Sequence, residues 1–152
     1  MPRLTAKEKE LIAVGTAVSA GCQRCCNYHF KQVFEEGATV DEVEAAVASS
    51  ALVIQHADEQ MQRKAYVLMS IEREEQELDD KGDTEQIALL VKVGAAVASN
   101  CSPTIEHYIA AAKAMDIEIG NIRYAIKIAK MILGKAGEFA DEAIAEVIEK
   151  VA

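Results

Sequence analysis

Apolar side chains recur along the chain at the three- and four-residue spacing of amphipathic helices. Capping boxes at Thr5–Glu8 and Thr39–Glu42, and a similar signal at Asp83–Gln86, predict three helix starts, while Gly21 and Gly37 are expected to end two helices. No stretch alternates apolar and polar residues one by one, as a half-buried strand would. The predicted helices begin near residues 5, 23, 39, 84, 102, 119 and 136. The pattern therefore predicts an all-α fold of about six to eight helices.

Three details of this pattern concern helix boundaries. The helix from residue 39 is expected to reach the mid-seventies, where the charged stretch 72–83 begins a connector. Ser102 and Pro103 are expected to cap a helix and to occupy its first position. Gly134 and Gly137 are expected to separate the last two helices, over about 119–133 and 136–150.

Two stretches of the sequence match each other at an offset of 79 residues, 5–22 and 84–101. The identical pairs are Thr5/Thr84, Leu11/Leu90, Val14/Val93, Gly15/Gly94, Ala17/Ala96, Val18/Val97 and Cys22/Cys101. The match predicts a single domain over residues 1–152, made of two tandem helical repeats at about 5–75 and 84–150.

Only the first repeat keeps a full set of reactive groups. These are Glu10, Cys22, Cys25 and His29. The second repeat has, at the same places, Leu89, Cys101, Thr104 and Tyr108. The first repeat is therefore expected to hold the one working site, and the second to be degenerate.

Charge and composition exclude several classes of protein. The formal net charge of −9 argues against nucleic acid as a partner, because phosphate binding needs a basic face. No segment reaches the roughly 20 apolar residues of a membrane span. The first residues lack the apolar stretch of a signal peptide, so the expected location is cytoplasmic. In a reducing compartment, closely spaced cysteines point to metal binding or redox chemistry.

Cys22, Cys25 and His29 follow one another at the three- and four-residue spacing that shares one helix face. The cysteines fall in the first turn of the predicted second helix, where unpaired backbone N–H groups and the helix dipole favour a thiolate. A thiolate beside a second thiol is the least that thiol–disulfide exchange requires.

Glu10 is expected to lie beside His29. Glu10 precedes the turn at Gly21 by eleven residues, about 16 Å of helix, and His29 follows that turn by eight residues, about 12 Å. If the two helices fold back on each other, the carboxylate reaches the imidazole, fixes its tautomer and raises its basicity.

The pattern Glu10-x11-Cys22-x2-Cys25-x3-His29, with its flanking residues, resembles the signature of the alkyl hydroperoxidase D proteins of the carboxymuconolactone decarboxylase superfamily. The resemblance covers about residues 5–60, and 84–135 as a degenerate copy. It implies an all-α, two-repeat fold and a thiol-dependent peroxidase, or disulfide oxidoreductase, that acts on hydroperoxides. By this resemblance Cys25 attacks the peroxide and Cys22 resolves the sulfenic acid into a disulfide, while His29 and Glu10 relay the proton.

The resemblance also implies partners. A dithiol protein, lipoyl-bearing or thioredoxin-like, would reduce the disulfide again, and neither a cofactor nor a metal is required. Relatives form trimers or hexamers, and the apolar helix 43–54 independently favours a homo-oligomer. Two features depart from the signature: Arg24 lies between the two cysteines, and Cys26 is an additional thiol that either pairs or packs.

Other interpretations remain open. The protein could be a non-redox enzyme of the decarboxylase type, although those enzymes lack the cysteine pair, or a non-enzymatic helical protein. Cys22, Cys25 and His29 could instead bind zinc or iron, with Glu10 or Cys26 as the fourth ligand. Cys101 is expected to be a small buried side chain, and His56 to line a pocket or to be a hydrogen-bonded helix residue. The methionines expected in the core or an interface are Met61, Met69, Met115 and Met131.

Overall fold

The computed structural model describes residues 3–74, 76, 78, 80 and 85–151. In this part of the chain every regular element is an α-helix, which confirms the predicted all-α class. The six helices are α1 (Ala6–Ala20), α2 (Gln23–Glu35), α3 (Val40–Leu68), α4 (Gln86–Ser99), α5 (Ser102–Ala114) and α6 (Ile119–Val151). None of these helices is both long enough and apolar enough to cross a membrane.

Local signals in the sequence place the helices of the first half. Thr5 and Thr39 each form a complete capping box, with the glutamate three residues on bonding back to the threonine N–H. Gly21 closes α1 and Gly37 follows α2, with φ angles of 65° and 88°. Only glycine adopts this left-handed conformation without cost, so the predicted helix ends are confirmed.

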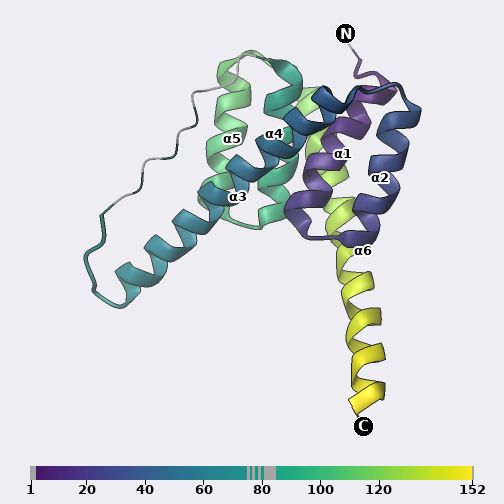
Figure 1. Ribbon diagram of the computed structural model, residues 1–152. Coiled ribbons are helices and arrows are strands. Elements are labelled where there is room, and N and C mark those ends of the chain that lie inside the picture. The colour runs from purple at the N-terminus through teal and green to yellow at the C-terminus, as the bar shows by residue number, and fades with distance from the viewer. Residues whose placement is uncertain (1–2, 75, 77, 79, 81–84, 152) are drawn as a thin grey trace.

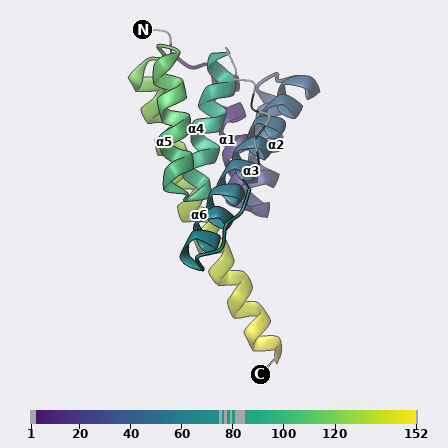
Figure 2. The same ribbon diagram turned by 90° about the vertical axis from the view of Figure 1, so that its left-hand side faces the viewer.

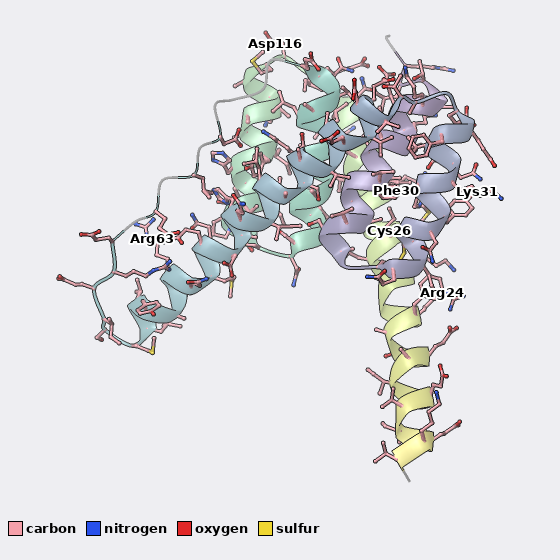
Figure 3. All side chains as sticks on the ribbon, in the orientation of Figure 1. Arg24, Cys26, Phe30, Lys31, Arg63 and Asp116 are labelled. Carbon is pink, nitrogen blue, oxygen red and sulfur yellow. A yellow bond between two sulfur atoms is a disulfide. The ribbon has the colours of Figure 1, made fainter. Side chains whose placement is uncertain are left out.

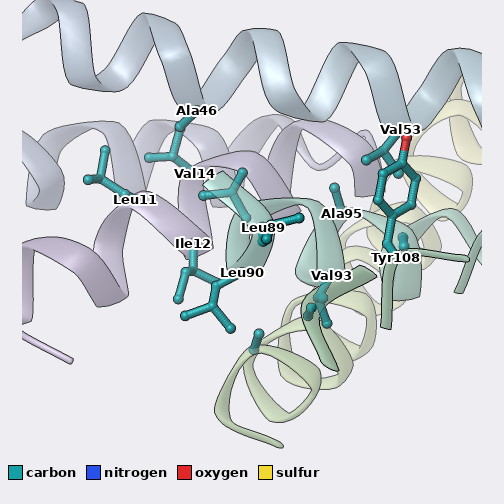
Figure 4. Close-up of a cluster of buried hydrophobic side chains, with 14 of the residues drawn as sticks. Leu11, Ile12, Val14, Ala46, Val53, Leu89, Leu90, Val93, Ala95 and Tyr108 are labelled. Atoms are coloured by element: carbon teal, nitrogen blue, oxygen red, sulfur yellow. The ribbon is translucent and has the colours of Figure 1, made fainter. Parts of the chain in front are cut away.

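α1 and α4 form the central pair of the bundle, and α3 and α6 pack against both of them (Figures 1 and 2). Two glycines allow the central helices to approach closely: a Cβ at Gly15 would strike Val91, and one at Gly94 would strike Thr16. The surrounding side chains form the main core (Figure 4). Full burial of a side chain such as Ile12 contributes about 1.5–3 kcal/mol, so this seam holds the two halves together.

The two halves share one helical layout. Each has two shorter helices followed by a long one, and the turn between the short helices has the same form in both. Gly21 and Asn100 take left-handed angles there, and Cys22 and Cys101 are the N-caps that follow. The long helix of each half packs over the short helices of the other half, since α6 contacts α1 and α2 while α3 contacts α4 and α5.

The predicted end of α3 is wrong. α3 stops at Leu68 rather than in the mid-seventies, because Ser70 turns to a φ of 58° and the N–H of Ile71 donates to the carbonyl of Tyr66 at 3.0 Å. This is the hydrogen bonding of a closed helix C-terminus.

The predicted division at Gly134 and Gly137 is also wrong. α6 runs through both glycines as one helix of 33 residues. A glycine within a helix costs only about 1 kcal/mol relative to alanine, and the residues around these two are good helix formers such as Lys135 and Ala136.

Two predicted helix starts in the second half shift by a residue or more. The N-cap of α5 is Cys101, so Ser102 is already helical and Pro103 occupies the second position. α4 begins at Gln86 after Glu85, whose side chain makes no capping hydrogen bond. The predicted capping residues at 83 and 84 lie outside the described part of the chain.

Candidate active site

Cys22 and Cys25 lie at the start of α2, where Cys22 is the N-cap. The two are joined by a disulfide, with their Cα atoms 5.2 Å apart, and the N–H of Cys25 donates to Sγ of Cys22 at 3.2 Å. Their exposed fractions are 5% and 6%. The backbone N–H groups of this first turn favour negative charge, so the setting stabilises a thiolate when the disulfide is reduced.

His29 lies one turn further along α2 and is hydrogen-bonded to Glu10 on α1. Nδ1 of His29 is 2.8 Å from Oε2 of Glu10. The side chains are 10% and 24% exposed, so the pair is largely screened from water and its electrostatic interaction is stronger than on the surface. The carboxylate selects the tautomer with hydrogen on Nδ1 and leaves Nε2 as the basic nitrogen. The hairpin of α1 and α2 thus brings together the two residues that the sequence spacing predicts to meet.

α6 supplies the remaining wall of the site. A pocket of about 380 Å³ lies between the start of α2 and the middle of α6. Its lining residues are Arg24, Cys25, Tyr28, His29, Met131, Ile132, Lys135 and Phe139. A disulfide sulfur and the imidazole therefore share one hollow that is mostly apolar, and its volume suits a small molecule.

Arg24, near the start of α2, contacts α6 at the edge of this pocket (Figure 3). Its guanidinium lies 3.8 Å from the ring centre of Phe139 and 2.6 Å from Oε2 of Glu142. Both charged side chains are more than half exposed, so the ion pair adds little to stability. Its effect is geometric: it holds the cation beside the ring rather than over the disulfide.

Two neighbouring groups have shifted pKa values. Burial raises the pKa of the Cys26 thiol, which packs with the apolar residues around the disulfide. Burial also raises the pKa of the Tyr124 hydroxyl on α6, and the negative charge of Glu10 adds to this effect. Cys26 is therefore protonated at neutral pH and is a poor nucleophile there.

In the second half, the positions that correspond to Cys25 and His29 are occupied by Thr104 and Tyr108, which make different contacts. Nδ1 of His56, on α3, lies 2.7 Å from the hydroxyl of Thr104. Asp80 receives Nζ of Lys92 at 2.9 Å and the hydroxyl of Tyr108 at 3.0 Å. Burial lowers the pKa of His56, and the nearby His107, whose ring is stacked on that of His56, lowers it further.

Cys101 and the four methionines singled out in the sequence differ in how far they are buried. Cys101 is 3% exposed and free, as expected for a small buried side chain. The four methionines are not core residues of this chain, since each is about half exposed. Among the described side chains, no group of three or more His, Cys, Asp or Glu lies close enough to hold a metal ion.

The α6 wall of the pocket is not apparent from the sequence. Ile132, Lys135 and Phe139 are more than 100 residues from Cys25, and their apolar spacing resembles that of any packed helix. The repeat does not supply this information, because it does not show whether a long helix covers the short helices of its own half or those of the other half.

Comparison with known proteins relates the first part of the chain to a protein family. Residues 2–60 match the model of the carboxymuconolactone decarboxylase family. No curated protein matches the chain, and no solved structure does. The matched segment contains all four residues of the candidate site, from Glu10 to His29.

Proposed function

We propose that the chain is a thiol-dependent peroxidase of the alkyl hydroperoxidase D type. Its residues 2–60 match the model of the carboxymuconolactone decarboxylase family, and it carries a cysteine pair beside an imidazole–carboxylate pair. One observation carries this proposal: Cys25 and His29 line the same pocket, and Cys22 lies within bonding distance of Cys25. The substrate is a hydroperoxide, and the electrons come from a dithiol partner, lipoyl-bearing or thioredoxin-like.

The first half-reaction starts from the reduced cysteines. Nε2 of His29 accepts the thiol proton of Cys25, and Glu10 stabilises the imidazolium through Nδ1. The Cys25 thiolate attacks the terminal oxygen of the hydroperoxide, so an S–O bond forms while the O–O bond breaks. The alkoxide leaves with the proton from His29 as an alcohol, and Cys25 becomes a sulfenic acid.

The second half-reaction closes the disulfide. The thiol of Cys22 loses its proton and attacks the sulfenic sulfur of Cys25, an S–S bond forms, and the hydroxyl leaves as water. Two thiols and one hydroperoxide thus give one disulfide, one alcohol and one water. A dithiol reductant then exchanges with the Cys22–Cys25 disulfide and is itself oxidised, which returns both thiols.

The pocket supports an organic substrate. Most of its wall is apolar, from Tyr28, Met131, Ile132 and Phe139, and such a surface favours an alkyl or aryl group over water. Arg24 and Lys135 also line this pocket, and their charges are paired with Glu142 and Glu138.

Steady-state turnover tests this proposal. The reduced protein is mixed with a small organic hydroperoxide and a dithiol such as dithiothreitol, and loss of hydroperoxide is followed. We expect turnover in the natural chain and in Cys101→Ser, which changes the matching cysteine of the second half. Cys22→Ser and Cys25→Ser are expected to abolish it. Loss of hydroperoxide that survives both substitutions would show that the cysteine pair does not carry the reaction, and absence of turnover in the natural chain would remove the peroxidase proposal.

A further inference from the structure

Lys135 lines the pocket together with Cys25, but the two half-reactions leave it without a role. It lies on the stretch of α6 that passes the start of α2 (Figure 1). Ile132, three residues earlier, belongs to the same buried cluster as the two cysteines of the site. The counterpart of Lys135 in the second half of the site pattern shows what a side chain at this position reaches.

The offset of 79 residues that relates the two halves also relates α3 to α6. The two long helices begin at Val40 and Ile119, which differ by this offset. The buried positions of the two helices correspond in the same way, as the pairs Val43/Ile122, Ala46/Ala125, Ser50/Ala129 and Val53/Ile132 show. Both helices therefore present the same register to the core, and His56 of α3 is the counterpart of Lys135 of α6.

His56 contacts the residue that stands where the first half has Cys25. Nδ1 of His56 lies 2.7 Å from Oγ1 of Thr104, and Thr104 is fully buried. Thr104 and Cys25 are each the third residue of their short helix, so Oγ1 of Thr104 is the counterpart of Sγ of Cys25. In the second half, the long helix thus supplies a hydrogen-bonding group directly to this position. Lys135 has a longer side chain than histidine, so it is able to span the same gap to Cys25.

While the disulfide is closed, Sγ of Cys25 has no charge and Lys135 pairs with Glu138. Nζ of Lys135 is 3.3 Å from Oε2 of Glu138, and both side chains are more than half exposed. An exposed ion pair of this kind adds little to stability, so a stronger partner readily replaces it. Reduction creates such a partner, because Cys25 is only 6% exposed and a thiolate there has lost most of its hydration.

The other cations of the pocket are less suited to this role. The guanidinium of Arg24 has two contacts, with the ring of Phe139 and with the carboxylate of Glu142. The imidazole of the site becomes positive only when it accepts a proton, whereas the charge of a lysine does not depend on the proton that Cys25 releases. On the helices packed against α2, the charged side chains that the described structure places at the site are Glu10 of α1 and Lys135, Glu138 and Glu142 of α6.

We propose that Lys135 is a further catalytic residue, whose ammonium group pairs with the Cys25 thiolate in the reduced protein and favours the ionised form of this thiol. The inference deepens the proposed function and rests on it, because it takes Cys25 as the thiol that reacts. When the disulfide closes, the negative charge on sulfur disappears and Lys135 returns to Glu138. The second half keeps the same contact with a different pair of side chains, His56 and Thr104.

The ionisation of Cys25 is measured on the reduced full chain in the absence of hydroperoxide. The rate at which iodoacetamide alkylates Cys25, located by mass spectrometry, is followed as a function of pH. Lys135→Met is expected to raise the pKa of the Cys25 thiol by about 1, because it removes a neighbouring opposite charge. Lys135→Arg keeps the positive charge and is expected to retain most of the natural pKa. Lys130→Met changes an exposed lysine on another face of α6 and is expected to leave the pKa unchanged.

The same variants separate this inference from the peroxidase proposal. With an organic hydroperoxide, Lys135→Met is expected to form the disulfide about 10-fold more slowly below the pKa of the thiol, and at nearly the natural rate where the thiol is fully ionised. A raised pKa in a chain that does not react with hydroperoxide would support the ion pair and remove only the peroxidase function. A pKa of Cys25 that Lys135→Met leaves unchanged, or that Lys130→Met raises equally, would overturn the inference and leave the peroxidase proposal standing.

Discussion

At the scale of single residues, the proposed function depends most on the hydrogen bond between Glu10 and His29. The imidazole is one helical turn beyond Cys25, and the carboxylate holds it in one tautomer. This pairing was predictable from the sequence, because helix rise and the position of one glycine turn fix the depth of both residues. The contact of Arg24 with Glu142 was not, since the two are separated by 118 residues and no local signal links them.

Glu10→Gln is expected to slow the oxidation of the reduced protein by an organic hydroperoxide about 10- to 100-fold. The substitution replaces a charge-assisted hydrogen bond with a neutral one, and bonds to charged groups contribute about 1.5–3 kcal/mol. Stopped-flow measurement of disulfide formation reports the rate. Glu106→Gln, an exposed carboxylate on α5, is the matched control and is expected to leave the rate unchanged. Equal rates in the two variants would show that Glu10 has no part in the relay.

Cys26→Ser is expected to leave peroxide-driven disulfide formation intact. Burial raises the pKa of the Cys26 thiol, so little thiolate forms at neutral pH and the residue competes poorly with the other cysteines. Peptide mapping of the oxidised natural protein should find Cys26 still reduced. A disulfide that includes Cys26 as the main product would contradict this assignment.

His56 is expected to titrate below the ordinary histidine value of 6.5, because burial and the neighbouring His107 both lower its pKa. The unfolded chain then binds a proton that the folded chain does not, so this contribution to stability is present above about pH 6.5 and is lost as the pH falls towards the lowered pKa. NMR titration of the imidazole measures the shift. His107→Gln should move the pKa of His56 upward, and an unchanged or lower value would exclude the proposed interaction between the two rings.

At the scale of helices, local capping signals predict the helix boundaries better than residue composition does. Thr5, Gly21 and Thr39 mark boundaries because the cap itself is a local interaction within four residues. Gly134 and Gly137 do not end a helix, because a glycine does so only where the backbone turns left-handed, and both lie within α6. The predicted end of α3 is too late because a charged stretch is compatible with either a helix or a connector.

The close approach of α1 and α4 gives a prediction with an internal control. Gly94→Ala is expected to lower the free energy of unfolding by about 1–3 kcal/mol, because the added methyl group meets Thr16 and Ile12 in a packed seam. Gly134→Ala, at an exposed helical site with open space around it, is expected to raise it by about 0.5–1 kcal/mol. Urea denaturation compares the two, and a stabilised Gly94→Ala protein would mean that the helices are not in contact there.

At the scale of the whole molecule, the exchange of long helices between the halves explains why one site needs the entire chain. The first half supplies the four residues of the candidate site, while α6 of the second half lines the pocket beside Cys25. The sequence repeat indicated two similar units, but periodicity within each unit does not reveal which unit a long helix covers. In the second half the matching place is taken by the contacts of His56, Thr104 and Tyr108, which supports the proposal that it is degenerate.

The most direct measurement is a single turnover of the reduced Cys22→Ser protein with one equivalent of organic hydroperoxide, followed by a sulfenic-acid trap and mass spectrometry. Without the resolving thiol, the proposal predicts that the trapped adduct forms on Cys25, while Cys26 and Cys101 remain unmodified. It also predicts that the natural protein, treated in the same way, gives the Cys22–Cys25 disulfide with no trapped adduct. Thiols that stay reduced in the presence of excess hydroperoxide would contradict the peroxidase function, and an adduct on another cysteine would contradict the role of Cys25.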